Sequence, residues 1–176
     1  MANKKSLAMY NGALQELAIG DVSNQFSIAR LTATQASTVI TLASITQLVL
    51  PLAINSIYKI ECFVVFQSAA ITTGLNLAIL TPAGATNFIE IKVPIVSTAG
   101  NTTLSNIFPS AAIAVNTGGV LGTGVTAITS NHTAIITGFI SVGATAGNCQ
   151  IQFATEVGAS GVTLQIGSLL VLQRIT

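Results

Sequence analysis

The sequence predicts an all-β fold, an antiparallel sandwich or barrel, on three observations. Short segments rich in Val, Ile, Leu and Thr recur along the chain, and Gly, Pro, Asn and Ser separate them as turn formers. No long segment shows the apolar period of an amphipathic helix. A length of 176 residues allows one domain with a substantial core.

The segment from 57 to 67 is the clearest predicted strand. Its side chains alternate between two faces, and one face is apolar throughout. The members of that face are Tyr58, Ile60, Cys62, Val64 and Phe66. The other face begins with Lys59 and Glu61 and becomes apolar towards its end. A strand that becomes apolar on both faces is expected to cross a thick core or to contact a neighbouring subunit.

The other strands are predicted from the same composition and alternation. In chain order they are 26–32, 38–41, 47–52, 75–80, 88–93, 134–142, 149–155, 162–166 and 168–175. Turn signals separate them, among them Thr72-Thr73-Gly74 and Thr81-Pro82-Ala83-Gly84. The strand at 88–93 alternates polar and apolar residues, which indicates one solvent-exposed face. The last strand, in contrast, is apolar on both faces. The glycine-rich run from 116 to 124 is expected to be a loop.

Residues 1–25 differ from the rest of the chain. Their apolar residues lie among Asn, Gln, Lys and Glu without a sustained period, and Asn11-Gly12 and Gly20-Asp21 are turn signals. We therefore predict two regions. Residues 1–25 form an N-terminal arm, extended or with one short helical turn, and residues 26–176 form the β-sandwich domain.

Charge is scarce in this sequence. Only 6% of the residues are charged, whereas about a quarter are charged in ordinary soluble proteins. Between Lys92 and Glu156 there is no Asp, Glu, Lys or Arg. A monomer needs charge to cover its surface, so we expect other chains to cover much of this one. The sequence lacks the run of about eighteen apolar residues that a membrane helix needs, and its scattered basic residues form no stripe for nucleic acid.

Residues suited to catalysis are few. The sequence has one His, His132, and one Asp, Asp21, and Asp21 falls in the predicted arm. Cys62 and Cys149 lie on apolar strand faces, where they are expected to be small buried hydrophobes rather than a disulfide. A Cys–His pair has no supporting local motif, and the glycine-rich run lacks the Lys-Ser or Lys-Thr of a phosphate-binding loop. We therefore predict no enzyme activity, no catalytic residues, no metal site and no cofactor.

A series of turn and strand markers extends through the predicted domain. In order they are Tyr58-Lys59-Ile60-Glu61, Thr73-Gly74-Leu75, Thr81-Pro82-Ala83-Gly84, Ile136-Thr137-Gly138-Phe139-Ile140, the segment from Gly147 to Glu156, Gly167-Ser168-Leu169-Leu170 and Arg174. With these markers the chain resembles, over residues 10–175, the small jelly-roll proteins of tailed-bacteriophage particles, whose sandwich is similar to the tumour necrosis factor-like trimers. The arm, with Asn11 to Leu17 followed by Gly20-Asp21, is similar to a segment at the start of many phage structural proteins.

The resemblance implies an antiparallel jelly-roll β-sandwich with an extended N-terminal arm, assembled as a homotrimer. It also implies a capsid decoration or cement protein, made in the host cytoplasm, that holds neighbouring major capsid subunits together on the capsid surface. The arm residues expected to bind the major capsid protein or another virion protein are Lys4, Lys5, Leu7, Tyr10, Leu14 and Leu17.

Two other roles stay open at this point. A tail or neck protein would use the same arm, and the sequence does not separate it from a capsid protein. A fibre protein that binds a cell-surface glycan would use loops such as 101–109 and 116–124. Sugar sites usually present aromatic platforms, and the absence of Trp from this chain counts against receptor binding.

Overall fold

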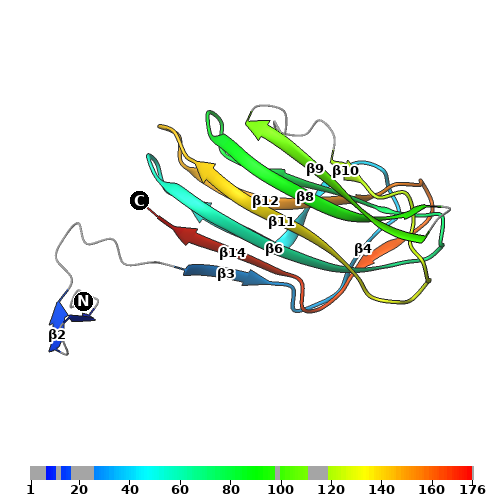
Figure 1. Cartoon of the computed structure of the whole chain (residues 1–176), viewed down its shortest axis with the longest axis horizontal. Helices are drawn as coiled ribbons and strands as arrows, with labels where there is room; N and C mark the ends of the chain where they lie inside the picture. Colours follow the sequence, from blue (N-terminus) through cyan, green and yellow to red (C-terminus); the bar gives the residue numbers. More distant parts are fainter. Residues whose placement is uncertain (1–6, 11–12, 17–25, 98–99, 111–118, 176) are drawn as a thin grey trace.

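The computed structural model of this protein describes residues 7–10, 13–16, 26–97, 100–110 and 119–175, and the side chains of 26–95 and 119–175. These residues form strands and the turns between them, and no helix occurs among them. Two antiparallel sheets pack against each other as two layers (Figure 1). The predicted all-β fold is therefore confirmed.

The larger sheet places the first and last strands of the domain side by side. Its main path, in spatial order, is β3 (Phe26–Arg30), β14 (Leu169–Arg174), β6 (Ile57–Ser68), β11 (His132–Ser141), β8 (Thr86–Ser97) and β9 (Gly100–Ser110). Beside β6 lies β13 (Val162–Leu164), which pairs in turn with β4 (Gln35–Ser37). The smaller sheet has the order β10 (Val120–Leu121), β7 (Leu75–Leu80), β12 (Gly147–Thr155) and β5 (Ala43–Leu52).

Successive strands alternate between the two sheets. From β5 to β8 each strand lies in the opposite sheet from the one before it, and the same holds from β9 to β13. This alternation is typical of a jelly roll. The pairing of β8 with β9, from Asn87 opposite Ser110 to Ser97 opposite Gly100, widens the larger sheet by one strand. The predicted antiparallel jelly-roll sandwich is confirmed.

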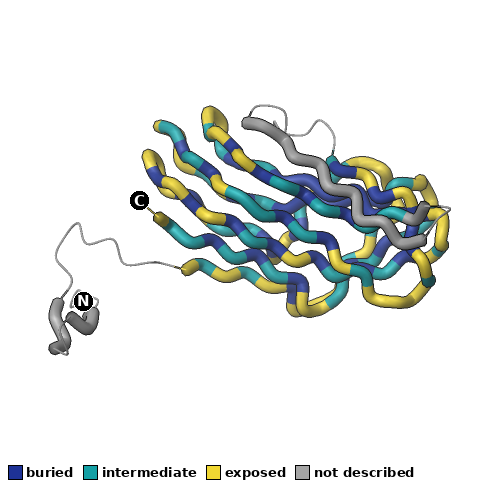
Figure 2. The backbone as a smooth tube through the Cα atoms, in the orientation of Figure 1, coloured by how far each residue is buried: buried dark blue, intermediate teal, exposed yellow. Residues whose placement is uncertain are grey.

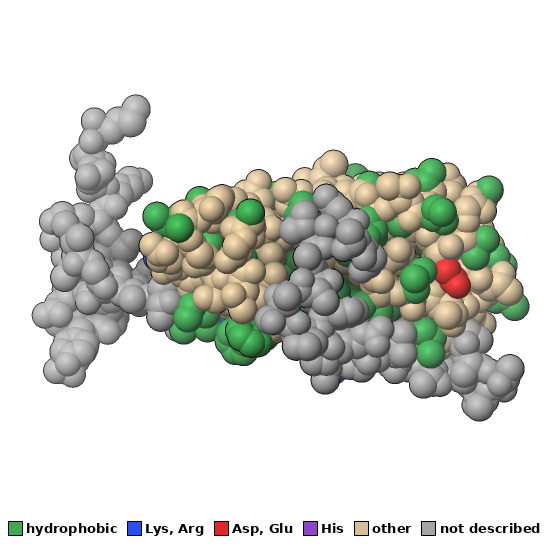
Figure 3. Space-filling model, turned by 90° about the horizontal axis from the view of Figure 1, so that it is seen from above, with side chains coloured by type: hydrophobic (Ala, Val, Ile, Leu, Met, Phe, Trp, Pro, Cys, Tyr) green, Lys and Arg blue, Asp and Glu red, His purple; other side chains and the backbone are tan. Residues whose placement is uncertain are grey.

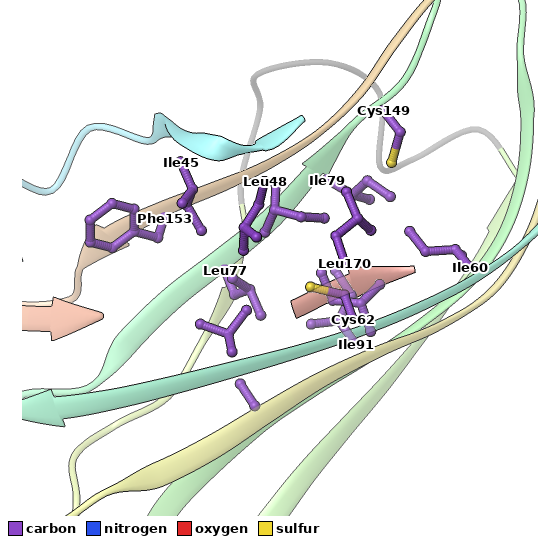
Figure 4. Close-up of a cluster of buried hydrophobic side chains, with 14 of the residues drawn as sticks. Ile45, Leu48, Ile60, Cys62, Leu77, Ile79, Ile91, Cys149, Phe153 and Leu170 are labelled. Atoms are coloured by element: carbon purple, nitrogen blue, oxygen red, sulfur yellow. The ribbon is translucent and has the colours of Figure 1, made fainter. Parts of the chain in front are cut away.

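The core lies between the sheets and follows the predicted alternation. All five residues on the apolar face of β6 are buried, and Ile60 and Phe66 are fully so. Figure 2 shows how buried and less buried positions alternate along the strands of the larger sheet. In the close-up of Figure 4, Leu48 and Phe153 of the smaller sheet lie in the same apolar cluster as Leu170 of the larger one.

Residues 38–41, predicted as a strand, instead form part of a loop, and the short strand β4 precedes them. Two of their backbone carbonyls accept hydrogen bonds from the end of β12 and from the loop after it. The N–H of Thr155, the last residue of β12, donates to the Val39 carbonyl at 3.1 Å, and the N–H of Ala159 in the loop donates to the Thr38 carbonyl at 2.9 Å. These contacts outweigh the strand preference of the β-branched residues.

Two segments predicted as loops contain strands. Residues 101–109 belong to β9, where eleven residues rich in Thr, Asn and Ser pair with β8. An edge strand tolerates such residues, and Pro109 as well, because one side of its backbone needs no partner strand. Within the glycine-rich run, Val120 and Leu121 form β10, while residues 116–118 lie outside the described structure.

The described part of the N-terminal arm is a pair of strands. β1 (Leu7–Tyr10) and β2 (Ala13–Glu16) pair antiparallel, with Tyr10 opposite Ala13. The sequence between them, Asn11-Gly12, favours a two-residue hairpin turn. These eight residues are extended, which is one of the two conformations predicted for the arm. The division into an arm over 1–25 and a domain over 26–176 stays a prediction.

Candidate protein-binding surface

His132 takes part in contacts that hold a loop to the core. Its Nε2 lies 3.1 Å from the carbonyl oxygen of Ala127, and its ring lies beside the buried ring of Phe66, with 5.6 Å between centroids. Asp21 lies outside the described residues. Among the residues that the structure describes, no three of His, Cys, Asp and Glu are grouped so that they could hold a metal ion. Among the same residues, no helix has the length and hydropathy of a membrane span.

The side of the larger sheet that faces away from the core carries many apolar side chains. We call this surface the outer face, and its apolar members are Phe26, Ile28, Ile57, Phe63, Val65, Phe88, Ile135, Phe139, Leu169 and Val171. They come together because β3, β14, β6, β11 and β8 lie side by side. Phe26, Ile28 and Phe88 are 59%, 63% and 59% exposed. Many exposed apolar side chains on one face of a sheet are typical of a surface that binds protein.

Two ion pairs lie on the outer face. The Nζ of Lys59 is 2.7 Å from Oε1 of Glu61 on β6, and the Nζ of Lys92 is 3.0 Å from Oε2 of Glu90 on β8. Each pair joins residues two apart in one strand, whose side chains share a face. Because all four groups are partly exposed, the pairs add little to the stability of one chain. Their effect is to balance charge locally on a surface that otherwise carries uncharged side chains, apolar ones and polar ones such as Thr137 and Gln173.

A second group of exposed aliphatic side chains lies on the loops at one end of the sandwich. We call it the loop end, and its members are Val39, Ile40, Ile71, Ile128 and Val157. The loops are held together by hydrogen bonds between backbone groups, and the N–H of Gly74 also donates to Oε2 of Glu156 at 2.9 Å. Viewed from above, hydrophobic side chains gather around one acidic group at an end of the molecule (Figure 3).

The structure places three of the six predicted arm residues in strands. Leu7 and Tyr10 lie in β1, and Leu14 lies in β2. Because β1 pairs with β2, these positions belong to one two-stranded sheet. Lys4, Lys5 and Leu17 lie outside the described residues. The role of all six as contacts to a partner stays a prediction.

The sequence identified single strands with two apolar faces but not the surface that they form together. Alternation alone shows that Phe63 and Val171 lie on the second faces of their strands. Their common surface depends on the strand order, in which β14 from one end of the chain lies between β3 and β6. No local pattern in the sequence carries that order.

Comparisons with known proteins assign no family to this chain. No protein-family model matches the chain, and no curated protein matches it. Among solved structures, it is similar to the infectious bursal disease virus VP2 subviral particle, with 10% identity and a TM-score of 0.26 over 96% of this chain and 44% of the other. The Gx strain of the same virus gives 14% identity and a TM-score of 0.19 over 96% and 43%. The chain spans less than half the length of these proteins, and likeness at these scores carries no argument about function.

The two cysteines are free and buried in the core, as predicted. Burial raises the pKa of the Cys149 thiol from 9.0 to about 12, and burial together with the neighbouring Cys149 raises the pKa of Cys62. In the unfolded chain these thiols lose their protons near their ordinary pKa, while in the folded chain they keep them to higher pH. The unfolded state therefore binds fewer protons above pH 9, and stability falls as the pH rises from 9 towards 12.

We predict that Cys149 contributes a loss of about 1.4 kcal/mol in the free energy of unfolding per pH unit within that window. The measurement is urea denaturation at several pH values between 9 and 11, for the natural chain and for Cys149→Ala. The variant should show a shallower loss, because it removes one of the two buried thiols. Equal slopes for the two proteins would contradict the prediction.

Proposed function

We propose that this protein is a structural protein of a virus particle, a capsid decoration protein of a tailed bacteriophage that acts by binding rather than catalysis. It is made in the host cytoplasm, assembles as a homotrimer and joins the capsid surface through contacts with the major capsid protein. The observation that carries the proposal is the outer face. A jelly-roll domain that exposes Phe26, Ile28 and Phe88 is suited to a place among other protein chains rather than in free solution.

In this proposal the arm supplies the attachment. Each apolar side chain of the arm that becomes buried against a capsid subunit adds about 1.5–3 kcal/mol. Three arms on one trimer raise the effective concentration of the second and third contacts once the first has formed. Attachment to several subunits would hold neighbouring capsomers together against the pressure of the packaged genome.

Removing residues 1–25 is expected to abolish capsid binding and leave the domain folded. A finer variant, Leu7→Ser with Leu14→Ser, should weaken binding roughly a hundredfold or more, because two anchoring side chains are lost. The matched control is Leu121→Ser, which changes a Leu that is 45% exposed on β10. Binding is measured by co-sedimentation with capsids that lack this protein. Unchanged binding by both arm variants would contradict attachment through the arm.

Cross-linking on purified particles distinguishes the position in the virion. Links from Lys4 and Lys5 to the major capsid protein are expected. Links to tail, neck or fibre proteins would instead place the chain in one of those structures. Lys59 and Lys92 serve as internal controls, since both belong to the domain. Absence of the protein from particles would overturn the virion assignment itself.

A further inference from the structure

We propose that copies of this chain pack on each other through the outer face. This proposal rests on the proposed function for one expectation, that the protein self-associates. It adds the surface and the side chains through which the copies make contact. The occupant of the face is a second copy of the same chain, and because the face pairs with itself, the contact is two-fold and separate from the three-fold contact of the proposed trimer.

The outer face is large enough for a stable interface. The outward side chains along β6, β11 and β8 each cover roughly 27 Å, and those along the shorter strands β14 and β3 cover roughly 14 Å. With strands about 4.8 Å apart, such a face offers roughly 520 Å² per copy, and two contacting faces bury roughly 1,050 Å² in total. This reaches the roughly 1,000 Å² that a specific protein interface needs.

On β6, β11 and β8 the apolar side chains lie in two groups on either side of a polar row, and Val171 and Ile28 continue that row as apolar positions on β14 and β3. Phe139 lies opposite Phe88, and on the other side of the row Ile135 lies opposite Phe63. The polar row crosses three strands, with Thr137 of β11 opposite Glu61 on one side and Glu90 on the other. Aromatic side chains near the centre of a contact are typical of residues that dominate binding energy.

The charges on the outer face repeat with a half-turn about Thr137. Along β6 the outward order is Lys59, Glu61, Phe63. Along β8, which runs in the same direction two strands away, the outward order is Phe88, Glu90, Lys92. The half-turn exchanges lysine with lysine, glutamate with glutamate and phenylalanine with phenylalanine. A second copy placed on this face therefore meets the same order of side chains whether its strands run in the same direction as those of the first copy or in the opposite direction.

This arrangement favours a second copy over a highly charged partner. The centre of the face holds two ammonium groups and two carboxylates, so a neighbouring copy offers a carboxylate for each lysine. Arg30 adds a positive charge only at the margin, on edge strand β3. An anionic partner would meet Glu61 and Glu90 at the centre of the contact.

Two charge variants test the surface. Lys59→Glu gives the centre of the face three carboxylates and one ammonium group, and Glu61→Lys gives the reverse. Each variant alone should self-associate at least tenfold more weakly than the natural chain, because like charges meet. An equimolar mixture should regain association as a hetero-oligomer. The measurement is sedimentation velocity across a concentration series, with native mass spectrometry to identify the mixed species.

A pair of apolar variants provides the matched control. Phe139→Ser, at 44% exposure on the outer face, should also weaken self-association at least tenfold, while Ile128→Ser, at 50% exposure on the loop end, should not. Circular dichroism and thermal unfolding check that every variant is folded. A monomeric natural chain, no recovery on mixing, or an equal effect of Ile128→Ser would overturn the proposal. The assay contains no capsid, so failure of the arm to bind capsids leaves its outcome unchanged.

Discussion

Replacing Phe66 with alanine is expected to lower the free energy of unfolding by about 3–5 kcal/mol. Phe66 is fully buried on the inner face of β6, where that strand pairs with both β11 and β13. Its ring also lies against His132. Truncation to alanine removes buried apolar surface and leaves a cavity. The two sheets cannot easily close this cavity, because backbone hydrogen bonds fix the positions of their strands. Urea denaturation should show a lower midpoint with an unchanged slope.

The matched control is Phe88→Ala on β8. That side chain is 59% exposed on the outer face, so its removal should change the stability of a single chain by about 0.5 kcal/mol or less. The comparison is made at low protein concentration, where self-association does not contribute. Equal losses for the two phenylalanines would contradict the assignment of inner and outer faces.

Replacing Gly138 with alanine is expected to cost about 2–4 kcal/mol of stability. Gly138 lies in the middle of β11 with φ at 147°, a conformation that side chains rarely adopt. A Cβ there would lie 2.0 Å from the carbonyl oxygen of Phe88 and 2.9 Å from Cα of Ile89. Both atoms belong to the backbone of β8, so relief requires the two strands to separate at the centre of the larger sheet.

The variant Gly84→Ala distinguishes the cost of the backbone conformation from the cost of a steric clash. Gly84 also has a positive φ, 77°, but a Cβ there would have no atom within 4 Å. This variant should therefore lose only the conformational term, about 1 kcal/mol. Thermal unfolding of both variants measures the difference. A loss at Gly84 as large as that at Gly138 would show that contact with β8 is not the cause.

Most strands could be predicted because their signals are local. β7 has the predicted bounds, Leu75–Leu80, since Gly74 precedes it and Thr81-Pro82 follows it. β6 shows its inner and outer faces directly in its alternation. The two free cysteines were predicted correctly for the same reason, because each lies on an inner face.

The segments that were predicted wrongly depend on a distant partner. β9 is polar, and its extended form comes from pairing with β8 along its whole length. Residues 38–41 have the composition of a strand, but the carbonyls of Thr38 and Val39 accept hydrogen bonds from Ala159 and Thr155, more than a hundred residues later in the chain. The outer face was predicted only one strand at a time, because its strands come from both ends of the chain.

Because β14 lies between β3 and β6, the larger sheet can be completed only at the end of synthesis. The chain grows from its N-terminus at about 5–20 residues per second, so roughly 5 to 20 s separate the completion of β6 from that of β14. Until then β3 lacks its neighbour, and β6 has an open edge along the positions that β14 will fill. The larger sheet, and the outer face with it, closes only when the last strand arrives. Association through the complete face, including Leu169 and Val171 of β14, is therefore expected only after the last strand has been made.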